Sequence, residues 1–123
     1  MKIHESAEDY LEQILMLKEQ KGSVRSIDIA VAMGFSKPSV SIAMKNLREN
    51  GYISVDADGF ITLEEPGLEI ARRIYDRHRK LSAFFVALGV DPDIAAHDAC
   101  KIEHDLSDET YSKMIAFAEQ YKQ

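Results

Sequence analysis

Three residues of metal-binding type lie close together near the C-terminus: Cys100, Glu103 and His104. If this segment is helical, their spacing of i, i+3 and i+4 places a thiolate, a carboxylate and an imidazole on one face. His97 lies one turn before Cys100 and could add a fourth donor. For each residue alone, the alternative is a solvated helix face with a half-buried cysteine, because a free Cys often behaves as a small hydrophobe. That alternative does not explain a Glu and a His beside the Cys, so the set indicates a divalent-metal site.

The composition limits what such a site could serve. The chain has 123 residues, of which 46% are hydrophobic and 29% charged, and these values are typical of a globular protein with one compact domain or two small ones. The single Cys excludes an internal disulfide, and the N-terminus lacks the apolar run of a signal peptide. We therefore expect a cytoplasmic protein. No segment approaches the length of a membrane span, so we expect no membrane partner.

The charge is unevenly distributed along the chain. The formal net charge is −6, yet residues 21–51 contain five basic residues against two acidic ones. Residues 81–123 contain three lysines against eight acids. A basic patch on an acidic body fits a DNA-binding protein whose affinity stays low until something alters it.

The N-terminal half predicts a helix-turn-helix. Apolar residues at helical spacing predict a helix from about Ser6 to Gln20, with Ser6 as its N-cap. A short helix over Ser26–Met33, with Ser26 as its N-cap, precedes a tight turn at residues 34–36. The next helix, Pro38–Asn50, has its proline in the first turn, where the missing N–H costs nothing. A plain helical hairpin is the alternative, but the three-residue turn with a Gly favours a helix-turn-helix with Pro38–Asn50 as recognition helix.

A β-hairpin is predicted directly after these helices. Residues 52–55 and 60–63 are β-rich and flank a turn, Asp56-Ala57-Asp58-Gly59. Helix, turn, helix and hairpin together predict a winged helix. On its recognition helix, we expect Ser39 and Ser41 at base edges or phosphates, and Lys37, Lys45 and Arg48 at phosphates. The alternative for the basic residues is that they only solvate an exposed helix.

The C-terminal half predicts three further helices. Pro66-Gly67 marks a boundary, and apolar spacing predicts a long helix from Leu68 to about Leu88. Its basic residues could face DNA or pair with the acidic C-terminal part. A second helix begins after Asp91 and ends near Leu106, and a third carries an apolar stripe over residues 114–121. These stripes exceed what so small a layer can cover, so we expect a homodimer.

The order of these features resembles a known family. A winged helix, a linking helix and a segment with Cys-x-x-Glu-His are similar to the diphtheria-toxin-repressor family of metal-dependent transcriptional regulators. In length the chain resembles the two-domain manganese transport regulator branch. The resemblance covers nearly the whole chain and includes residues 7–12, 26–47, 77–78 and 100–107. It implies a mainly α fold, with a winged helix-turn-helix DNA-binding domain over residues 1–65 and a helical metal-binding and dimerisation domain over residues 66–123.

The resemblance also implies a ligand set, because in that family the ligands come from the first helix, the linking helix and the last segment. The implied ligands are Asp9, Glu12, His78, Cys100, Glu103 and His104. From the residues alone, Asp9 would be a capping-box acid three residues after Ser6, Glu12 a structural residue, and His78 a surface residue. The manganese branch has carboxylates at the positions of Asp9 and Cys100, whereas the iron branch has Met at the first and Cys at the second. In this chain Asp9 follows the manganese branch and Cys100 follows the iron branch.

The function implied is a metal-activated repressor. The metal would fix the two recognition helices of a homodimer for a palindromic double-stranded DNA operator. The mixed thiolate and carboxylate set predicts activation by Fe(II) or Mn(II), with Zn(II) or Co(II) possible in vitro. A small metalloenzyme and a winged-helix regulator that responds to an organic ligand are the alternatives. The sequence contains no H-E-x-x-H motif, no glycine-rich phosphate loop and no catalytic triad order, so we expect no enzyme, no catalytic residues and no organic substrate.

Overall fold

The computed structural model describes residues 5–120 and confirms a mainly helical fold. The chain divides after Arg73 into two compact units. The long helix α4, Glu65–Ala87, contributes its first turns to the first unit and the remainder to the second. Within the described part of the chain, no helix combines the length and hydropathy that a bilayer crossing requires.

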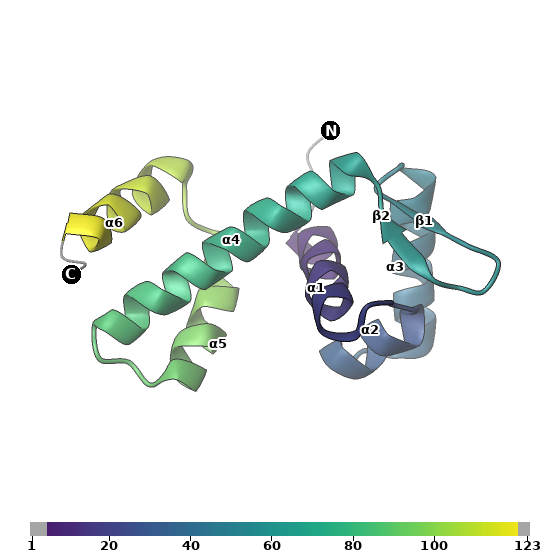
Figure 1. Ribbon diagram of the computed structural model, residues 1–123, viewed down its shortest axis with the longest axis horizontal. Coiled ribbons are helices and arrows are strands. Elements are labelled where there is room, and N and C mark those ends of the chain that lie inside the picture. The colour runs from purple at the N-terminus through teal and green to yellow at the C-terminus, as the bar shows by residue number, and fades with distance from the viewer. Residues whose placement is uncertain (1–4, 121–123) are drawn as a thin grey trace. The chain divides into compact units, whose positions relative to one another are not determined.

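The first unit is a winged helix-turn-helix. Its hairpin is antiparallel, with Ile53 opposite Leu63, and lies beside the helices in Figure 1. The elements before α4 are α1 (Glu5–Lys21), α2 (Ser26–Met33), α3 (Lys37–Glu49), β1 (Ile53–Val55) and β2 (Ile61–Leu63).

Apolar residues from every element of this unit form its core. Leu11 and Ile14 are one turn apart on α1 and fully buried, as helical periodicity predicts. They pack in one cluster with Ile29 of α2, Val40 of α3 and Ile61 of β2. Burial of so many large aliphatic side chains is the main force that holds the recognition helix in place.

The helix starts differ from those that the sequence predicted. Ser26 is the first residue of α2, and the preceding Arg25 is the N-cap. The Asp28 carboxylate accepts a hydrogen bond of 2.8 Å from the Arg25 backbone N–H, so a serine cap is not needed. The same carboxylate accepts a hydrogen bond from Lys21, and these two bonds hold the pKa of Asp28 below its ordinary value. Helix α3 begins one residue earlier than predicted, with Ser36 as its N-cap.

Helix α4 also begins earlier, at Glu65 rather than Leu68. The Pro66-Gly67 pair therefore lies in its first turn, where proline is tolerated because no intrahelical N–H bond is required. Gly67 is buried, and a Cβ there would overlap the Tyr52 carbonyl oxygen and lie 3.3 Å from Leu11 Cδ2. This glycine allows α4 to pack directly on the backbone before β1.

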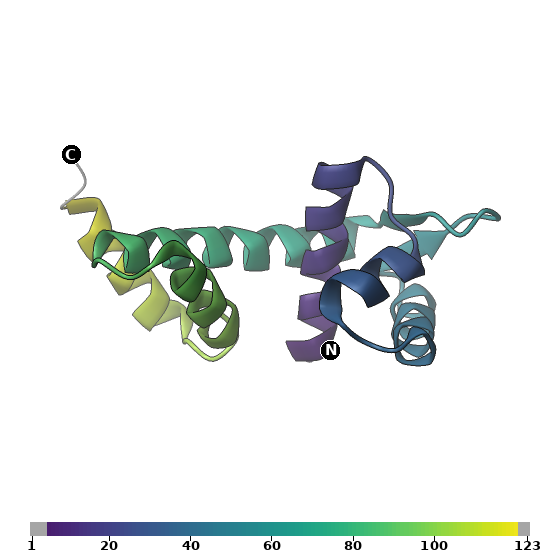
Figure 2. The same cartoon turned by 90° about the horizontal axis from the view of Figure 1, so that it is seen from below.

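The second unit consists of the C-terminal part of α4 with α5 (Pro92–Ile102) and α6 (Asp108–Gln120). Both views show α5 beside α4 (Figures 1 and 2). Ile74, Leu81, Ala95 and Ala99 are at most 1% exposed and form the core between these helices. Helix α6 has no buried residue among those described, and Tyr121 of its predicted stripe lies outside the described residues.

We expect Gly67→Ala to destabilise the first unit by about 1–3 kcal/mol, the usual cost of overpacking. The steric cost should exceed the gain of about 1 kcal/mol in helix propensity, because Tyr52 O also accepts a hydrogen bond of 2.9 Å from the Glu64 N–H. Urea unfolding measures the difference. Glu69→Ala, on the exposed side of the same helix, is the matched control and should change stability little. Equal stability of Gly67→Ala and wild type would contradict this packing.

Candidate metal centre and recognition helix

A fully buried carboxylate lies at the centre of the second unit. Glu103 is 0% exposed. Its Oε2 is 3.1 Å from His78 Nδ1 of α4, and its Oε1 is 3.4 Å from His104 Nε2. Burying an ionised carboxylate is costly unless hydrogen bonds and positive charge compensate it. The structure therefore brings together three of the residues that the sequence singled out.

The backbone that carries this cluster differs from the prediction. Helix α5 ends at Ile102, not near Leu106. Glu103 is its C-cap with helical dihedral angles of φ −60° and ψ −25°, and its N–H donates to Ala99 O at 3.0 Å. The expected i, i+3 relation between Cys100 and Glu103 is thus kept. His104 reaches Glu103 from the turn after the helix, so a continuous helical face does not account for its position.

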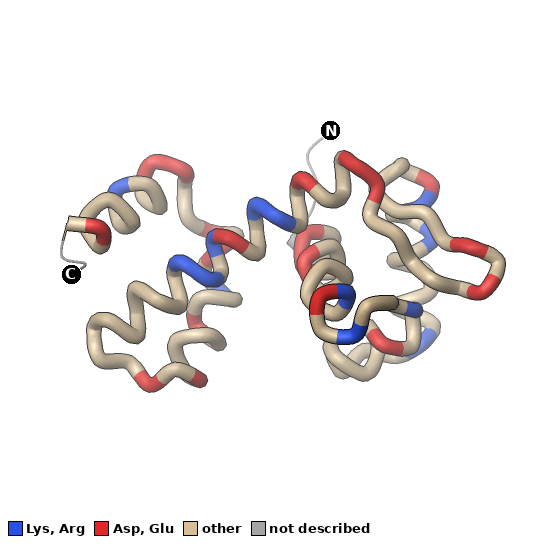
Figure 3. Tube along the Cα trace, in the orientation of Figure 1, with Lys and Arg blue, Asp and Glu red and all other residues tan. Residues whose placement is uncertain are grey.

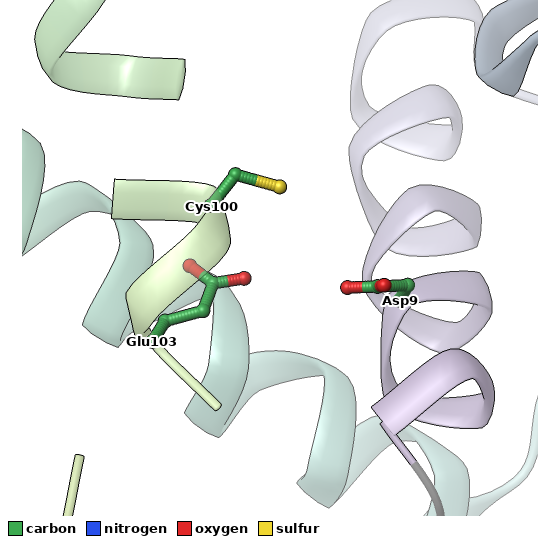
Figure 4. A group of neighbouring side chains, drawn as sticks. All are labelled: Asp9, Cys100 and Glu103. Carbon is green, nitrogen blue, oxygen red and sulfur yellow. The ribbon is translucent and has the colours of Figure 1, made fainter. Parts of the chain in front are cut away.

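The Cys100 thiol is exposed, while the buried positions of α5 are the two alanines, Ala95 and Ala99. Its Sγ lies within 4.8 Å of a Glu103 carboxylate oxygen. Figure 4 shows both side chains at the C-terminal end of α5. The alternative of a cysteine that fills the core does not fit this arrangement, because Cys100 is exposed and the buried residues of α5 are alanines.

His97 lies on the same helix but in different surroundings. Its side chain is 68% exposed, and Nδ1 lies 3.9 Å from Asp98 Oδ1 on the solvent side. Glu103, by contrast, is fully buried. The structure gives no support for His97 as a fourth donor.

The two candidate ligands of the first unit, Asp9 and Glu12, lie on α1 (Asp9 is drawn in Figure 4). Because α1 begins at Glu5, Ser6 lies inside the helix and is not its N-cap, so the capping-box interpretation of Asp9 is wrong. Asp9 is half-buried and Glu12 is only 5% exposed. Glu12 and Glu103 are two of the three buried charged side chains in the described part of the chain, which marks both as unusual.

The third buried charge, Arg77, is a residue whose role the sequence did not show. Its guanidinium donates to Leu106 O at 3.0 Å and lies 3.3 Å from Asp108 Oδ1. It also lies 4.5 Å from the centre of the Tyr111 ring, whose phenol pKa is raised by burial. Arg77 therefore ties the turn after Glu103 and the start of α6 to α4, directly beside His78.

These contacts decide a question that the sequence left open. The basic residues of α4 could have faced DNA or paired with acids. Arg77 pairs with Asp108 in the acidic C-terminal part, and within the first unit Arg73 pairs with Glu8 at 3.3 Å. At Arg77, pairing with the acidic C-terminal part is the observed outcome, whereas Arg73 pairs with an acid of α1, which neither alternative included.

The recognition helix α3 presents a polar face to solvent. Val40, Met44 and Leu47 form its buried stripe. All five residues that we expect at DNA are exposed: Lys37, Ser39, Ser41, Lys45 and Arg48. The Ser36 hydroxyl donates to Ser39 Oγ at 2.8 Å and accepts from the Ser39 N–H at 3.2 Å, so Ser39 is already engaged in the helix cap.

The hairpin tip carries charge of the opposite sign. Asp56 and Asp58 form the acidic tip that Figure 3 shows beyond the strands. The Asp56 carboxylate accepts hydrogen bonds of 2.9 Å from the backbone N–H groups of Asp58 and Phe60, and thus closes the turn. Phosphates repel an acidic tip and attract exposed basic residues such as those of α3.

The two halves of the chain match two protein-family models. Residues 2–59 match the model of the iron dependent repressor N-terminal DNA binding domain. Residues 64–123 match that of the iron dependent repressor metal binding and dimerisation domain.

Full-length relatives agree with the domain matches. The chain is 37% identical, over 96% of both chains, to an HTH-type transcriptional regulator of Methanocaldococcus jannaschii. It is 34% identical to the transcriptional regulator MntR of Salmonella typhimurium, over 95% of this chain and 74% of that protein. Among solved structures, a manganese-dependent transcriptional repressor in complex with manganese matches with a TM-score of 0.81 and 30% identity, over 89% of this chain and 51% of that one. The chain thus spans about half the length of that solved structure.

We expect Arg77→Ala to destabilise the second unit by roughly 2 kcal/mol, because it removes buried charge-assisted hydrogen bonds. It should also weaken metal binding, since the turn that carries His104 loses its attachment to α4. Urea unfolding and metal titration measure the two effects. Arg72→Ala, an exposed arginine on the same helix, should leave both unchanged. Wild-type metal affinity in Arg77→Ala would show that the turn holds its position without Arg77.

Proposed function

The chain belongs to the diphtheria-toxin-repressor family of metal-dependent transcriptional regulators, in its manganese transport regulator-like branch, and we propose that it is a metal-activated DNA-binding repressor that controls iron or manganese homeostasis. One observation carries the proposal: the buried Glu103 carboxylate with an imidazole at each oxygen, in a chain that also has a winged helix-turn-helix. We place the protein in the cytoplasm, where such a regulator meets its DNA.

The donor set fits a divalent transition metal. Glu103 Oε1 is buried and accepts no hydrogen bond from the described residues, although His104 Nε2 is 3.4 Å away. If His78 Nδ1 donates to Oε2, its Nε2 is left as a lone-pair nitrogen, the usual arrangement of a metal-binding imidazole. A bound cation would supply the positive charge that a buried carboxylate needs.

We propose six ligands. His78, Cys100, Glu103 and His104 belong to the second unit, and Asp9 and Glu12 belong to α1 of the first. We leave His97 out because its exposed ring lies beside Asp98, whereas the Cys100 Sγ lies within 4.8 Å of a Glu103 oxygen. A thiolate favours softer metals such as Fe(II), Co(II) and Zn(II), whereas carboxylates accept Mn(II). The mixed set should respond to both Fe(II) and Mn(II), with Fe(II) effective at lower concentration.

The second unit offers a surface for a homodimer. A groove of about 520 Å³ lies between α4 and α6, and it is mainly apolar. Leu88 is 65% exposed and Phe117 54% exposed. Leu81 of α4, by contrast, is fully buried in the core and is not part of this surface. The groove is lined by residues that include Ala83, Phe84, Leu88, Ile115, Phe117 and Ala118.

A dimer would present two recognition helices to DNA. Two-fold symmetry matches a palindromic operator when the two α3 helices are one helical repeat apart. In our proposal the metal orders the protein so that this spacing is met, and the affinity for the operator rises. The basic residues of α3 would then attract DNA, although the chain as a whole has a net charge of −6 and repels it.

Anaerobic DNA binding, titrated separately with Mn(II), Fe(II) and Zn(II), tests the function and the role of Cys100. We expect chelator to abolish binding to the protein's own upstream region. Cys100→Ala should weaken activation by every metal, and Cys100→Glu should shift the preference toward Mn(II) because it restores a set of hard carboxylates. His97→Ala is the matched control on α5 and should behave as wild type. A wild-type metal response in Cys100→Ala would remove Cys100 from the ligand set.

We expect the metal-free protein to be a dimer already, because the apolar groove between α4 and α6 does not depend on metal. Analytical ultracentrifugation in the presence of chelator measures this. Leu88→Asp should give a monomer, since it places a charge in the apolar contact. Val31→Asp, at an aliphatic residue of α2 that is 76% exposed, should remain dimeric. A monomeric wild-type protein without metal would contradict the prediction.

A further inference from the structure

The exposed face of the recognition helix is centred on an aliphatic residue that the expected DNA contacts do not include. Ile42 lies two residues after Val40 and two before Met44, both of which are buried. Two residues correspond to about 200° around an α-helix, so Ile42 points away from the core. Its side chain is 63% exposed.

Ile42 lies among residues suited to DNA. Lys45 is three residues later and Pro38 four residues earlier, so all three share one face of α3. Lys45 is exposed and basic, as expected of a phosphate contact. A single exposed aliphatic residue on a protein surface is common. Ile42 is distinguished by its position: it lies at the middle of the α3 face that, in the proposed function, enters the DNA major groove.

The core of the first unit does not need this side chain. Val40, Met44 and Leu47 fill the buried stripe of α3, and Ile42 is absent from the core cluster and from the hydrophobic residues packed against it. Ser39, at a neighbouring exposed position, is bonded to Ser36 in the helix cap. Apolar contact is therefore the main interaction that the centre of this face can offer to a base.

We infer that Ile42 reads the 5-methyl group of a thymine in the major groove of each half-site. Among the base edges in that groove, thymine alone presents a methyl group, and aliphatic side chains recognise it by removing both surfaces from water. The inference rests on the proposed function, because it requires that α3 enters the major groove. It assigns to Ile42 a part of the sequence preference that we had expected from the serines.

Replacement of thymine by uracil tests the contact directly, because uracil lacks only the methyl group. Wild-type protein with Mn(II) is first used to select binding sites from a randomised duplex pool. Each thymine of the selected half-site is then replaced by uracil symmetrically. At one position we expect wild-type affinity to fall about fourfold per half-site, or about fifteenfold for the dimer, as for one exposed methyl group. Ile42→Ala should bind the thymine and uracil duplexes equally.

Two matched variants separate base reading from other effects. Lys45→Ala should weaken binding to both duplexes alike and reduce the salt dependence, because a phosphate contact carries no methyl preference. Val31→Ala, at the exposed aliphatic residue of α2, should keep the wild-type preference for thymine. Thermal unfolding should show Ile42→Ala to be as stable as wild type, because the side chain lies outside the core.

The outcomes distinguish the inference from the proposed function. A thymine preference that persists in Ile42→Ala overturns the inference, and so does a wild-type protein that is indifferent to uracil at every position. In both cases metal-dependent DNA binding would still stand. A wild-type protein that selects no duplex with any metal would overturn the proposed function, and the inference with it.

Discussion

The second unit is built around one electrostatic constraint, the removal of the Glu103 carboxylate from water. A buried anion is stable only if its oxygens are hydrogen-bonded or neutralised. Here one oxygen faces His78 and the other faces His104. Glu103 Oε1 accepts no hydrogen bond from the described residues, and in our proposal a divalent cation would complete the compensation of the carboxylate. The same arrangement is what supports our proposal that this unit binds a divalent metal.

The geometry of this site depends on where α5 ends. Its short final turn keeps Glu103 in a helical conformation and releases His104 into the following turn. The guanidinium of Arg77 donates to the Leu106 carbonyl oxygen in that turn and pairs with Asp108 at the start of α6. Arg77 and His78 are consecutive residues of α4, so the residue that anchors the turn and the residue that contacts Glu103 move together. The supporting contacts thus belong to the site as much as its donors do.

In the first unit, the buried core and the surface charges have separate roles. The core orients α3, and its cap at Ser36 and the close packing at Gly67 define where the helices begin. The outer face of α3 is basic at its edges and aliphatic at Ile42. The acidic hairpin tip and the acidic C-terminal part repel the phosphates of DNA. Affinity therefore depends on how two copies of a small basic face are presented together, which is a property that a metal can regulate.

Local periodicity and spacing in the sequence were sufficient for the order of helices, the hairpin and the i, i+3 relation of Cys100 and Glu103, because these depend on residues close together along the chain. The order of the motifs was sufficient for the family. The position of His104 depended on where α5 ends. The ends of α4 and α5, the pairing of Arg77 with Asp108, and the exposure of His97 against the burial of Glu103 were decided by tertiary structure. Burial and ion pairing are set by contacts between elements far apart in sequence. Gly67 shows the reason: in the sequence it marks a boundary, whereas in the fold it lies in the first turn of α4, at a position where the Tyr52 backbone leaves no room for a side chain.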